Sequence, residues 1–355
     1  MRALCLYAGP AARARIERDG LQASDISTIA AAAGGPKGLI LCALDRFIFG
    51  NWLPESGQKI DLVGASIGAW RMAAACLNDP VVAFKRLEHD YLCQHYTLQP
   101  GEKRPSAATV SALFGEGLRS FYEGRVSEVL QHPRYRLHIF TSHGRHILRR
   151  EHPWRTPLGY LGAYASNLIH RRALGAWLER VVFSTPQTAL PFASDDYPTR
   201  QVDLSAANFG PALQASCSIP FVLQAVHDIP GAPAGAYWDG GMTDYHLHLN
   251  YRAAGLVLYP HFQQAVVPGW LDKHLKWRHG ATSFLDQVVL LAPNPDWVRT
   301  LPNGKLPDRS DFARYGEDLA GRVKAWSAAT AASAELADEF AAWLRRPDVT
   351  QVQAL

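Results

Sequence analysis

The sequence of 355 residues contains no run of about 18 consecutive apolar residues, the length that a membrane-spanning helix needs. Residues 1–19 lack the apolar core of a secretory signal peptide and are rich in arginine and alanine instead. Only five cysteines occur, an odd number without a Cys-x-x-Cys pair, so no disulfide framework is indicated. We therefore expect a protein of a reducing compartment, the cytoplasm, although export without a signal peptide stays open.

Internal repeats, low-complexity tracts and clear interdomain linkers are also missing, and the formal net charge is only +4. A hydrophobic content of 48% with 19% charged residues is typical of globular proteins with a sizeable core. We expect one catalytic unit over residues 1–309, with a C-terminal helical segment, residues 310–355, packed on it.

Apolar runs bounded by turn residues alternate with helical patterns. Besides the motif strands described below, we expect strands at residues 2–7, 136–142, 180–184, 199–204, 255–259 and 287–291. We expect helices at residues 37–49, 81–96, 208–217 and 311–345. Strands separated by helices predict an α/β fold with a mostly parallel sheet that helices cover on both faces.

Ser66 lies in the most informative motif, where an apolar strand beginning at Ile60 runs into Gly64-x-Ser66-x-Gly68. This pattern is that of a nucleophile elbow, in which the strand reverses into a helix within about two residues. The flanking glycines leave room for the reversal, and the strained serine lifts its hydroxyl clear of the sheet. The pattern therefore predicts a nucleophilic serine.

A glycine loop follows an earlier apolar strand, residues 26–33, and leads into a helix; it contains Gly34, Gly35, Lys37 and Gly38. Its spacing is not that of a P-loop. The backbone N–H groups of these four residues would cluster at a helix N-terminus, where they could bind a phosphate or a developing oxyanion.

Asp239 ends an aromatic-rich strand, residues 236–239, and precedes Gly240 and Gly241. Asp-Gly on its own is an ordinary turn signal. Here the strand would deliver a carboxylate into a glycine turn after the elbow and the glycine loop.

The ordered combination of glycine loop, elbow, an Ala-Ser-x-x-x-Pro segment at residues 215–220 and a late Asp-Gly-Gly resembles the patatin-like phospholipase family. The resemblance covers about residues 26–260. It implies a three-layer α/β/α fold and a lipid acyl hydrolase that cleaves carboxylic esters with a Ser–Asp dyad. Ser66 would be the nucleophile, Asp239 the base and the glycine loop the oxyanion hole, with no metal or organic cofactor.

Two segments depart from the family pattern. The glycine loop of the family usually begins Asp-Gly-Gly-Gly and carries an arginine, whereas this chain has Ala32-Ala33-Gly34-Gly35 and Lys37. After the aspartate the family often has Asn-Pro, whereas this chain continues through Asp244, His246 and His248, whose roles the sequence does not assign.

Alternatives stay open at this point. Ser66, Asp239 and His246 follow the order of an α/β-hydrolase triad, although few strands precede the elbow. His246-x-His248 could be a metal pair, but no other cluster completes such a site. An acyltransferase with the same nucleophile and a catalytically silent lipid-binding protein are the remaining readings.

Residues 143–180 are strongly basic, with seven arginines, two glutamates and a formal net charge of +5. Aromatic and leucine residues are interleaved with these arginines. We expect this segment to be an insertion or lid beside the active-site mouth that docks on anionic lipid. A solvated basic face is the simpler reading, and no motif supports nucleic-acid binding.

Overall fold

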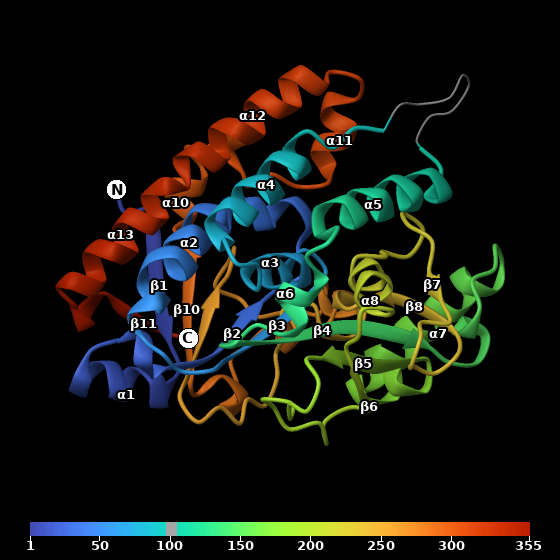
Figure 1. Cartoon of the computed structure of the whole chain (residues 1–355), viewed down its shortest axis with the longest axis horizontal. Coiled ribbons are helices and arrows are strands. Elements are labelled where there is room, and N and C mark those ends of the chain that lie inside the picture. The colour runs from blue at the N-terminus through green and yellow to red at the C-terminus, as the bar shows by residue number, and fades with distance from the viewer. Residues whose placement is uncertain (97–104) are drawn as a thin grey trace.

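The structure is a computed structural model that describes residues 1–96 and 105–355. It is built on an 11-stranded sheet whose main path runs in the order β11-β1-β10-β9-β2-β3-β4-β5-β6, with β8 and β7 branching from β4 (Figure 1). The strands are β1 (Leu4–Ala8), β2 (Ile26–Ala31), β3 (Ile60–Ala65), β4 (Tyr135–Gly144), β5 (Leu178–Ser184), β6 (Thr199–Asp203), β7 (Val226–His227), β8 (Ala236–Asp239), β9 (Leu256–Pro260), β10 (Val288–Pro293) and β11 (Val352–Ala354).

The five central strands, β10, β9, β2, β3 and β4, run parallel to one another. Antiparallel pairs occur where β1 joins β10 and where β5 and β8 join β4. Every residue of β3 and β10 is buried, as expected for parallel strands covered on both faces. The predicted α/β class with a mostly parallel sheet is confirmed.

Helices lie on both faces of this sheet. In Figure 1, α1 lies on one side, and α2, α3, α4, α12 and α13 lie on the other. The helices are α1 (Pro10–Asp19), α2 (Cys42–Phe47), α3 (Ile67–Ala75), α4 (Pro80–Leu92), α5 (Ala107–Tyr122), α6 (Val126–Leu130), α7 (Arg155–Ile169), α8 (Phe209–Ser216), α9 (Gly241–Asp244), α10 (Pro295–Val298), α11 (Ser310–Tyr315), α12 (Leu319–Ala332) and α13 (Ala334–Arg345). Within the described ranges, none of these helices has the length and apolarity that crossing a bilayer requires.

Two expected helices are divided in the structure. The helix expected at residues 37–49 begins as a 3-10 helix, Gly35–Leu41, and becomes α-helical only from Cys42, because Gly35 and Gly38 lower the helix propensity of its first turn. The helix expected at residues 311–345 is three helices, and Gly316 with a φ of 50° ends the first of them. No prediction was made for α1, α5 or α7. The expected helix at residues 81–96 reaches Leu92.

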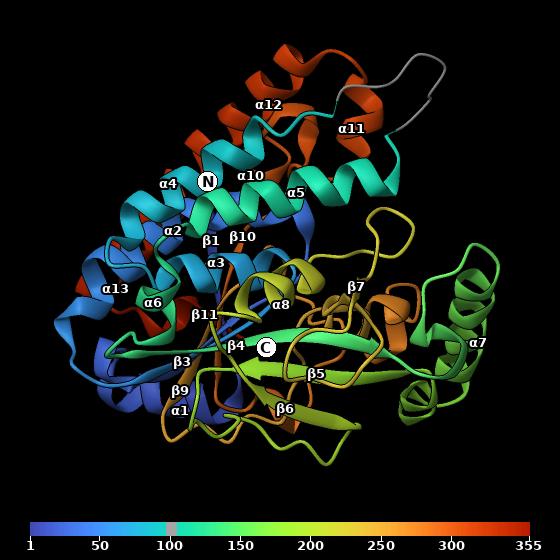
Figure 2. The ribbon, with the colours of Figure 1, turned by 45° about the vertical axis from the view of Figure 1, so that its right-hand side comes forward.

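The C-terminal segment, residues 310–355, does more than pack on residues 1–309. Trp326, Leu336 and Phe340 are buried in the main core, and β11 pairs in parallel with β1 at the edge of the sheet. A second, smaller core lies around α7 and β8 and includes Tyr160 and Trp238. Figure 2 shows α7 at the end of the molecule that carries this smaller core.

A buried ion pair joins the helix after the elbow to the helix after the glycine loop. The guanidinium of Arg71 in α3 donates two hydrogen bonds, of 2.6 and 2.7 Å, to the carboxylate of Asp45 in α2. Both side chains are almost fully buried. The pair therefore fixes the position of one motif relative to the other.

Removing one partner of this pair should be strongly destabilising because it leaves an uncompensated buried charge. We expect Arg71→Met to lower the free energy of unfolding by about 3–5 kcal/mol. The double variant Asp45→Leu, Arg71→Met should lie closer to the wild type, as measured by chemical denaturation. Equal losses in the single and double variants would contradict this account.

Candidate active site

Ser66 lies at a sharp turn between β3 and α3. Its φ of 56° and ψ of −128° place a non-glycine residue in a rarely populated region, as expected for a strained elbow. A Cβ atom on Gly68 would lie 1.9 Å from the carbonyl oxygen of Ala31, and one on Gly64 would lie 2.6 Å from the backbone of Ala69. Both glycines are therefore required by close backbone contact.

Strand β4 brings Ser66 and Asp239 together. Ala65 at the end of β3 is paired with Phe140, and Asp239 at the end of β8 is paired with the next residue, Thr141. The hydroxyl of Ser66 donates a hydrogen bond of 2.7 Å to Oδ2 of Asp239. The other carboxylate oxygen accepts a bond of 2.7 Å from the N–H of Gly241. The carboxylate is thus held from both sides.

Ser216 in α8 holds the backbone of the elbow. The N–H of Ser66 donates to Oγ of Ser216 over 2.9 Å, and this hydroxyl donates to the carbonyl oxygen of Phe140 over 2.7 Å. The Ala-Ser-x-x-x-Pro segment contains this serine, but the motif did not predict a role for it. Gly240 packs against the same carbonyl oxygen. A Cβ atom on Gly240 would lie only 2.2 Å from the oxygen of Phe140, so this position requires glycine.

The glycine loop borders the dyad on its other side. The N–H groups of Gly34 and Gly35 donate no hydrogen bond to any residue that the structure describes. Gly34 and Lys37 line a cavity that also contains Ser66, whereas Gly38 packs under Ile67 and lines neither cavity described below. Gly34 and Gly35 are therefore the loop donors best placed for an oxyanion, and Ile67, directly after the nucleophile, borders the site as well.

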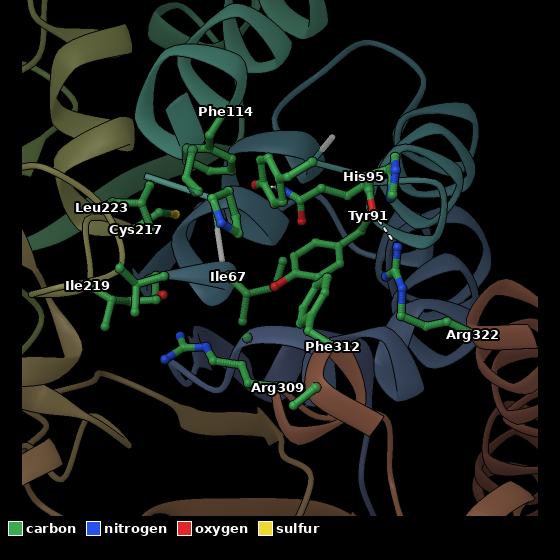
Figure 3. A pocket seen from close by; sticks show the side chains of 18 of the residues that line it. Ile67, Tyr91, His95, Phe114, Cys217, Ile219, Leu223, Arg309, Phe312 and Arg322 are labelled. Carbon is green, nitrogen blue, oxygen red and sulfur yellow. Dashed lines mark hydrogen bonds between the residues drawn. The ribbon is translucent and has the colours of Figure 1, made fainter. Parts of the chain in front are cut away.

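Two cavities meet at Ser66. The larger, of about 630 Å³, is mainly apolar and is lined by residues including Ile67, Trp70, Phe114 and Phe312 (Figure 3). The smaller, of about 300 Å³, has apolar residues such as Ile219 and Met242 in its wall, together with five charged residues: Lys37, Asp239, Lys273, Asp308 and Arg309. Ser66, Ile219 and Arg309 border both cavities. An ester carbonyl at Ser66 could therefore extend an apolar chain one way and a polar group the other.

Burial raises the pKa of Asp239 above its ordinary value of 3.8. The hydrogen bond from Ser66, the positive charge of Arg309 and the N–H of Gly241 act in the opposite direction, but burial has the larger effect. A carboxylate with a raised pKa is a better base toward a hydroxyl than an exposed one.

His246 and His248 do not take part in this arrangement. Among the described residues, neither bonds to Ser66 or Asp239. His246 accepts a hydrogen bond from the N–H of Val267 over 3.0 Å, and burial holds its pKa well below the usual value. His248 lies 3.1 Å from the hydroxyl of Thr282. The geometry favours a Ser–Asp dyad over a triad through His246.

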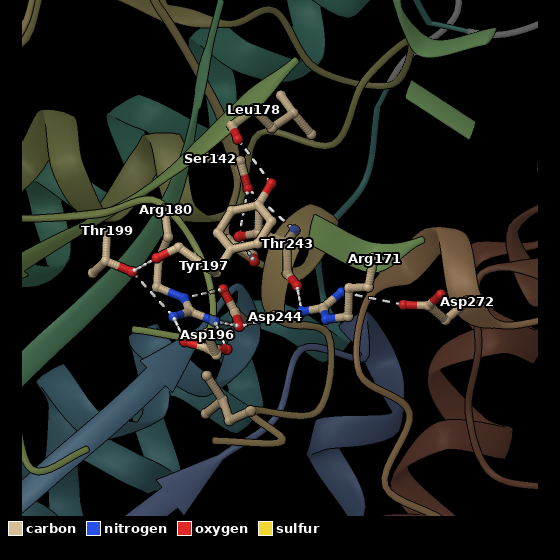
Figure 4. Close-up of polar contacts among 12 residues, drawn as sticks. Ser142, Arg171, Leu178, Arg180, Asp196, Tyr197, Thr199, Thr243, Asp244 and Asp272 are labelled. Carbon is tan, nitrogen blue, oxygen red and sulfur yellow. Dashed lines mark hydrogen bonds and ion pairs between the residues drawn. The ribbon is translucent and has the colours of Figure 1, made fainter. Parts of the chain in front are cut away.

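Asp244 anchors α9, the short helix that follows Asp239. The buried Arg180 donates hydrogen bonds of 2.6 and 2.8 Å to the carboxylate of Asp244 and also pairs with Asp196 (Figure 4). Arg171 contacts Asp244 and Asp272. Two of the seven arginines of residues 143–180 are therefore structural, and they do not form an exposed basic face.

A second serine, Ser184, contacts a histidine that in turn contacts an aspartate. Nδ1 of His138 lies 2.9 Å from its hydroxyl, and Nε2 lies 3.1 Å from a carboxylate oxygen of Asp61. These atoms lie inside the sheet, and neither cavity at Ser66 reaches them. We assign this group to the packing of β3, β4 and β5.

Lys273, Trp270 and Arg309 also border the cavities, but they come from loops without a motif that sequence reasoning could have used. In the described ranges, no group of three or more His, Cys, Asp or Glu side chains is arranged to hold a metal ion. Comparison with known proteins finds no matching family and no matching curated protein.

The raised pKa of Asp239 predicts a pH-dependent effect on stability. The folded chain binds this proton more tightly than the unfolded chain, so ionisation of Asp239 lowers stability as pH rises from 3.8 through the folded-state pKa. We therefore expect Asp239→Asn to unfold at a temperature equal to or above that of the wild type at pH 7. Calorimetry from pH 4 to 8 should show this difference shrinking toward low pH. A midpoint several degrees below wild type at every pH would show that the hydrogen-bonded carboxylate stabilises the fold.

Proposed function

We propose that this protein is a serine acyl hydrolase that cleaves carboxylic esters of lipids. The observation that carries the proposal is the hydrogen bond of 2.7 Å between the strained Ser66 and the buried Asp239, where an apolar cavity meets a smaller cavity with charged residues in its wall. The resemblance of the motifs to the patatin-like phospholipases supports the same assignment. The five cysteines are free, which supports a cytoplasmic location.

The reaction would proceed through an acyl-enzyme. Asp239 accepts the proton of Ser66 while the hydroxyl oxygen attacks the ester carbonyl, and the N–H groups of Gly34 and Gly35 stabilise the oxyanion. Collapse of the tetrahedral intermediate breaks the ester bond, and Asp239 gives its proton to the departing alcohol. Water, activated by the same carboxylate, then releases the fatty acid from Ser66.

The apolar cavity suits the acyl chain. Its wall contains Trp70 and Phe114, which meet edge-on, and also Tyr91 and Phe312 (Figure 3). A volume of about 630 Å³ lies within the usual range for small-molecule sites. Burial of an acyl chain there would contribute about 0.8 kcal/mol for each CH₂ group.

Replacement of Ser66 tests the proposal directly. We expect Ser66→Ala to lose at least about a thousandfold in ester hydrolysis and all labelling by a fluorophosphonate probe, because the nucleophile is removed. Fatty acid release should be measured on a panel of short esters, lysophospholipids and phospholipids. The thermal midpoint should stay close to that of the wild type.

Asp239→Asn should be as inactive as Ser66→Ala, since both groups are needed for one proton transfer. His248→Ala is the matched control and should stay within about tenfold of the wild type. A folded Ser66→Ala protein with normal turnover would refute the assignment.

We also propose that α7 docks the enzyme on an anionic lipid surface. Trp154, Leu158 and Leu161 follow one another on one helical face and are all exposed, with Trp154 83% exposed. Arg155, next to Trp154 in the chain, and Arg149, in the preceding 3-10 helix, are exposed as well. An apolar helical face bordered by cations is typical of interfacial helices.

The opposite, buried face of α7 lies near the larger cavity. Tyr160 of α7 meets the exposed Phe221 with ring centroids 5.8 Å apart, and the neighbouring Val222 lines the cavity. Helix α7 thus lies close to the cavity wall, so a lipid surface bound at its exposed face would be near the proposed site.

Docking can be tested with phosphatidylglycerol vesicles. We expect Leu158→Asp with Leu161→Asp to reduce cosedimentation at least about fivefold, because charged groups are introduced into the interfacial face. The ratio of activity on vesicle-bound ester to activity on a soluble ester should fall in parallel. Val82→Asp, on the exposed surface of α4, is the control. Equal vesicle binding by the α7 variant and the wild type would exclude this face.

A further inference from the structure

The smaller cavity at Ser66 carries three cationic side chains from three separate parts of the chain. Lys37 belongs to the glycine loop, Lys273 follows the 3-10 helix Trp270–Asp272, and Arg309 immediately precedes α11. All three line the cavity, which also contains Ser66 and Asp239. Arg309 also borders the larger cavity, where Arg322 and Glu317 are the other charged residues, whereas both lysines belong to the smaller cavity alone.

Carboxylates of the described residues offset these positive charges only in part, with Asp308 acting on Lys37 and Asp239 on Lys273. None of the three belongs to an ion pair, and the two carboxylates that line the cavity have other roles. Asp308 is paired with Lys305 over 2.7 Å, and Asp239 receives the hydrogen bond of Ser66. A net positive charge therefore faces the cavity.

Aromatic rings position the two lysines. Nζ of Lys273 lies 4.3 Å from the centre of the Tyr245 ring and 5.1 Å from the centre of a Trp270 ring, and Nζ of Lys37 lies 5.2 Å from the Phe262 ring. Such contacts hold an ammonium group in place without cancelling its charge.

The three positive charges also repel one another. Burial, followed by the charges of Arg309 and Lys37, lowers the pKa of Lys273 to about 8. Burial lowers the pKa of Lys37 as well. A bound anion would relieve this repulsion, whereas a quaternary ammonium group would add to it.

We propose that the smaller cavity binds a phosphate group on the alcohol half of the ester, so that the enzyme prefers anionic acyl esters over zwitterionic and neutral ones. This inference rests on the proposed hydrolase function. Guanidinium and ammonium groups form strong, charge-assisted hydrogen bonds to phosphate oxygens. With the acyl chain in the larger cavity, the carbonyl carbon lies at Ser66 and the phosphate lies among Lys37, Lys273 and Arg309.

The test compares three substrates with one acyl chain: a monoacylglycerol phosphate, the corresponding phosphocholine and the uncharged monoacylglycerol. We expect the wild type to show a kcat/KM at least about tenfold higher for the phosphate than for either other ester. Lys273→Met and Arg309→Gln should each lower this preference about tenfold, mainly through KM.

Lys273→Arg keeps the charge and should retain most of the preference. If Lys273 had only a structural role, Lys273→Arg and Lys273→Met would change the preference to the same extent. Lys276→Gln, an exposed lysine on the same loop, is the matched control and should leave the preference unchanged. Inorganic phosphate should compete with a short neutral ester in the wild type and at least about tenfold more weakly in Lys273→Met. Equal inhibition by chloride at the same ionic strength would refute a specific phosphate site.

The outcomes separate the two proposals. Hydrolysis of all three esters at equal rates, with activity lost in Ser66→Ala, would overturn the phosphate site and leave the hydrolase function standing. No hydrolysis of any ester would overturn the hydrolase function, and calorimetric titration with inorganic phosphate would then still decide whether the cavity binds this anion.

Discussion

The pairing of two strands with β4 is the constraint on which the candidate site depends. Strand β3 pairs with β4 in parallel and β8 pairs with it antiparallel. The last residues of the two strands, Ala65 and Asp239, therefore lie opposite neighbouring residues of β4, Phe140 and Thr141. The carbonyl oxygen of Phe140 also accepts the hydroxyl of Ser216, which in turn holds the N–H of Ser66. A shift of either strand by one residue would turn its side chains to the other face and separate the dyad.

Buried ion pairs hold the helices and strands around this site in fixed positions. Asp45 and Arg71 join the helices of the two N-terminal motifs, and Arg180 and Asp244 join α9 to β5. A buried charged group without its partner is strongly destabilising because it has lost its hydration. Each pair therefore disfavours conformations of the chain in which its two members are apart. Asp239 differs from these carboxylates, because a serine hydroxyl and a backbone N–H are its hydrogen-bond donors.

The parts of the fold that the sequence predicted are those with local steric or periodic signals. Gly64 and Gly68 mark the elbow because close backbone contact requires glycine there, and the buried central strands are continuous apolar runs. Helix α7 has a sequence pattern that points away from its observed packing. Thr156, Gly159 and Asn167 are on its buried face, while Leu158 and Leu161 face outward, so its apolar pattern does not indicate a core-facing helix. Lys273 and Arg309 reach the cavity only through the tertiary arrangement of loops, for which the sequence has no pattern.

The two residues of the dyad are 173 positions apart in the chain. Between them lie β4, β5 and α8, and the hydrogen bond can form only after these elements have assembled around β4. Contacts of such high sequence separation form late because the entropy of loop closure has to be overcome first. A partly folded chain would therefore carry an unpaired serine and an unpaired carboxylate, and the reactive pair would exist only in the completed native topology.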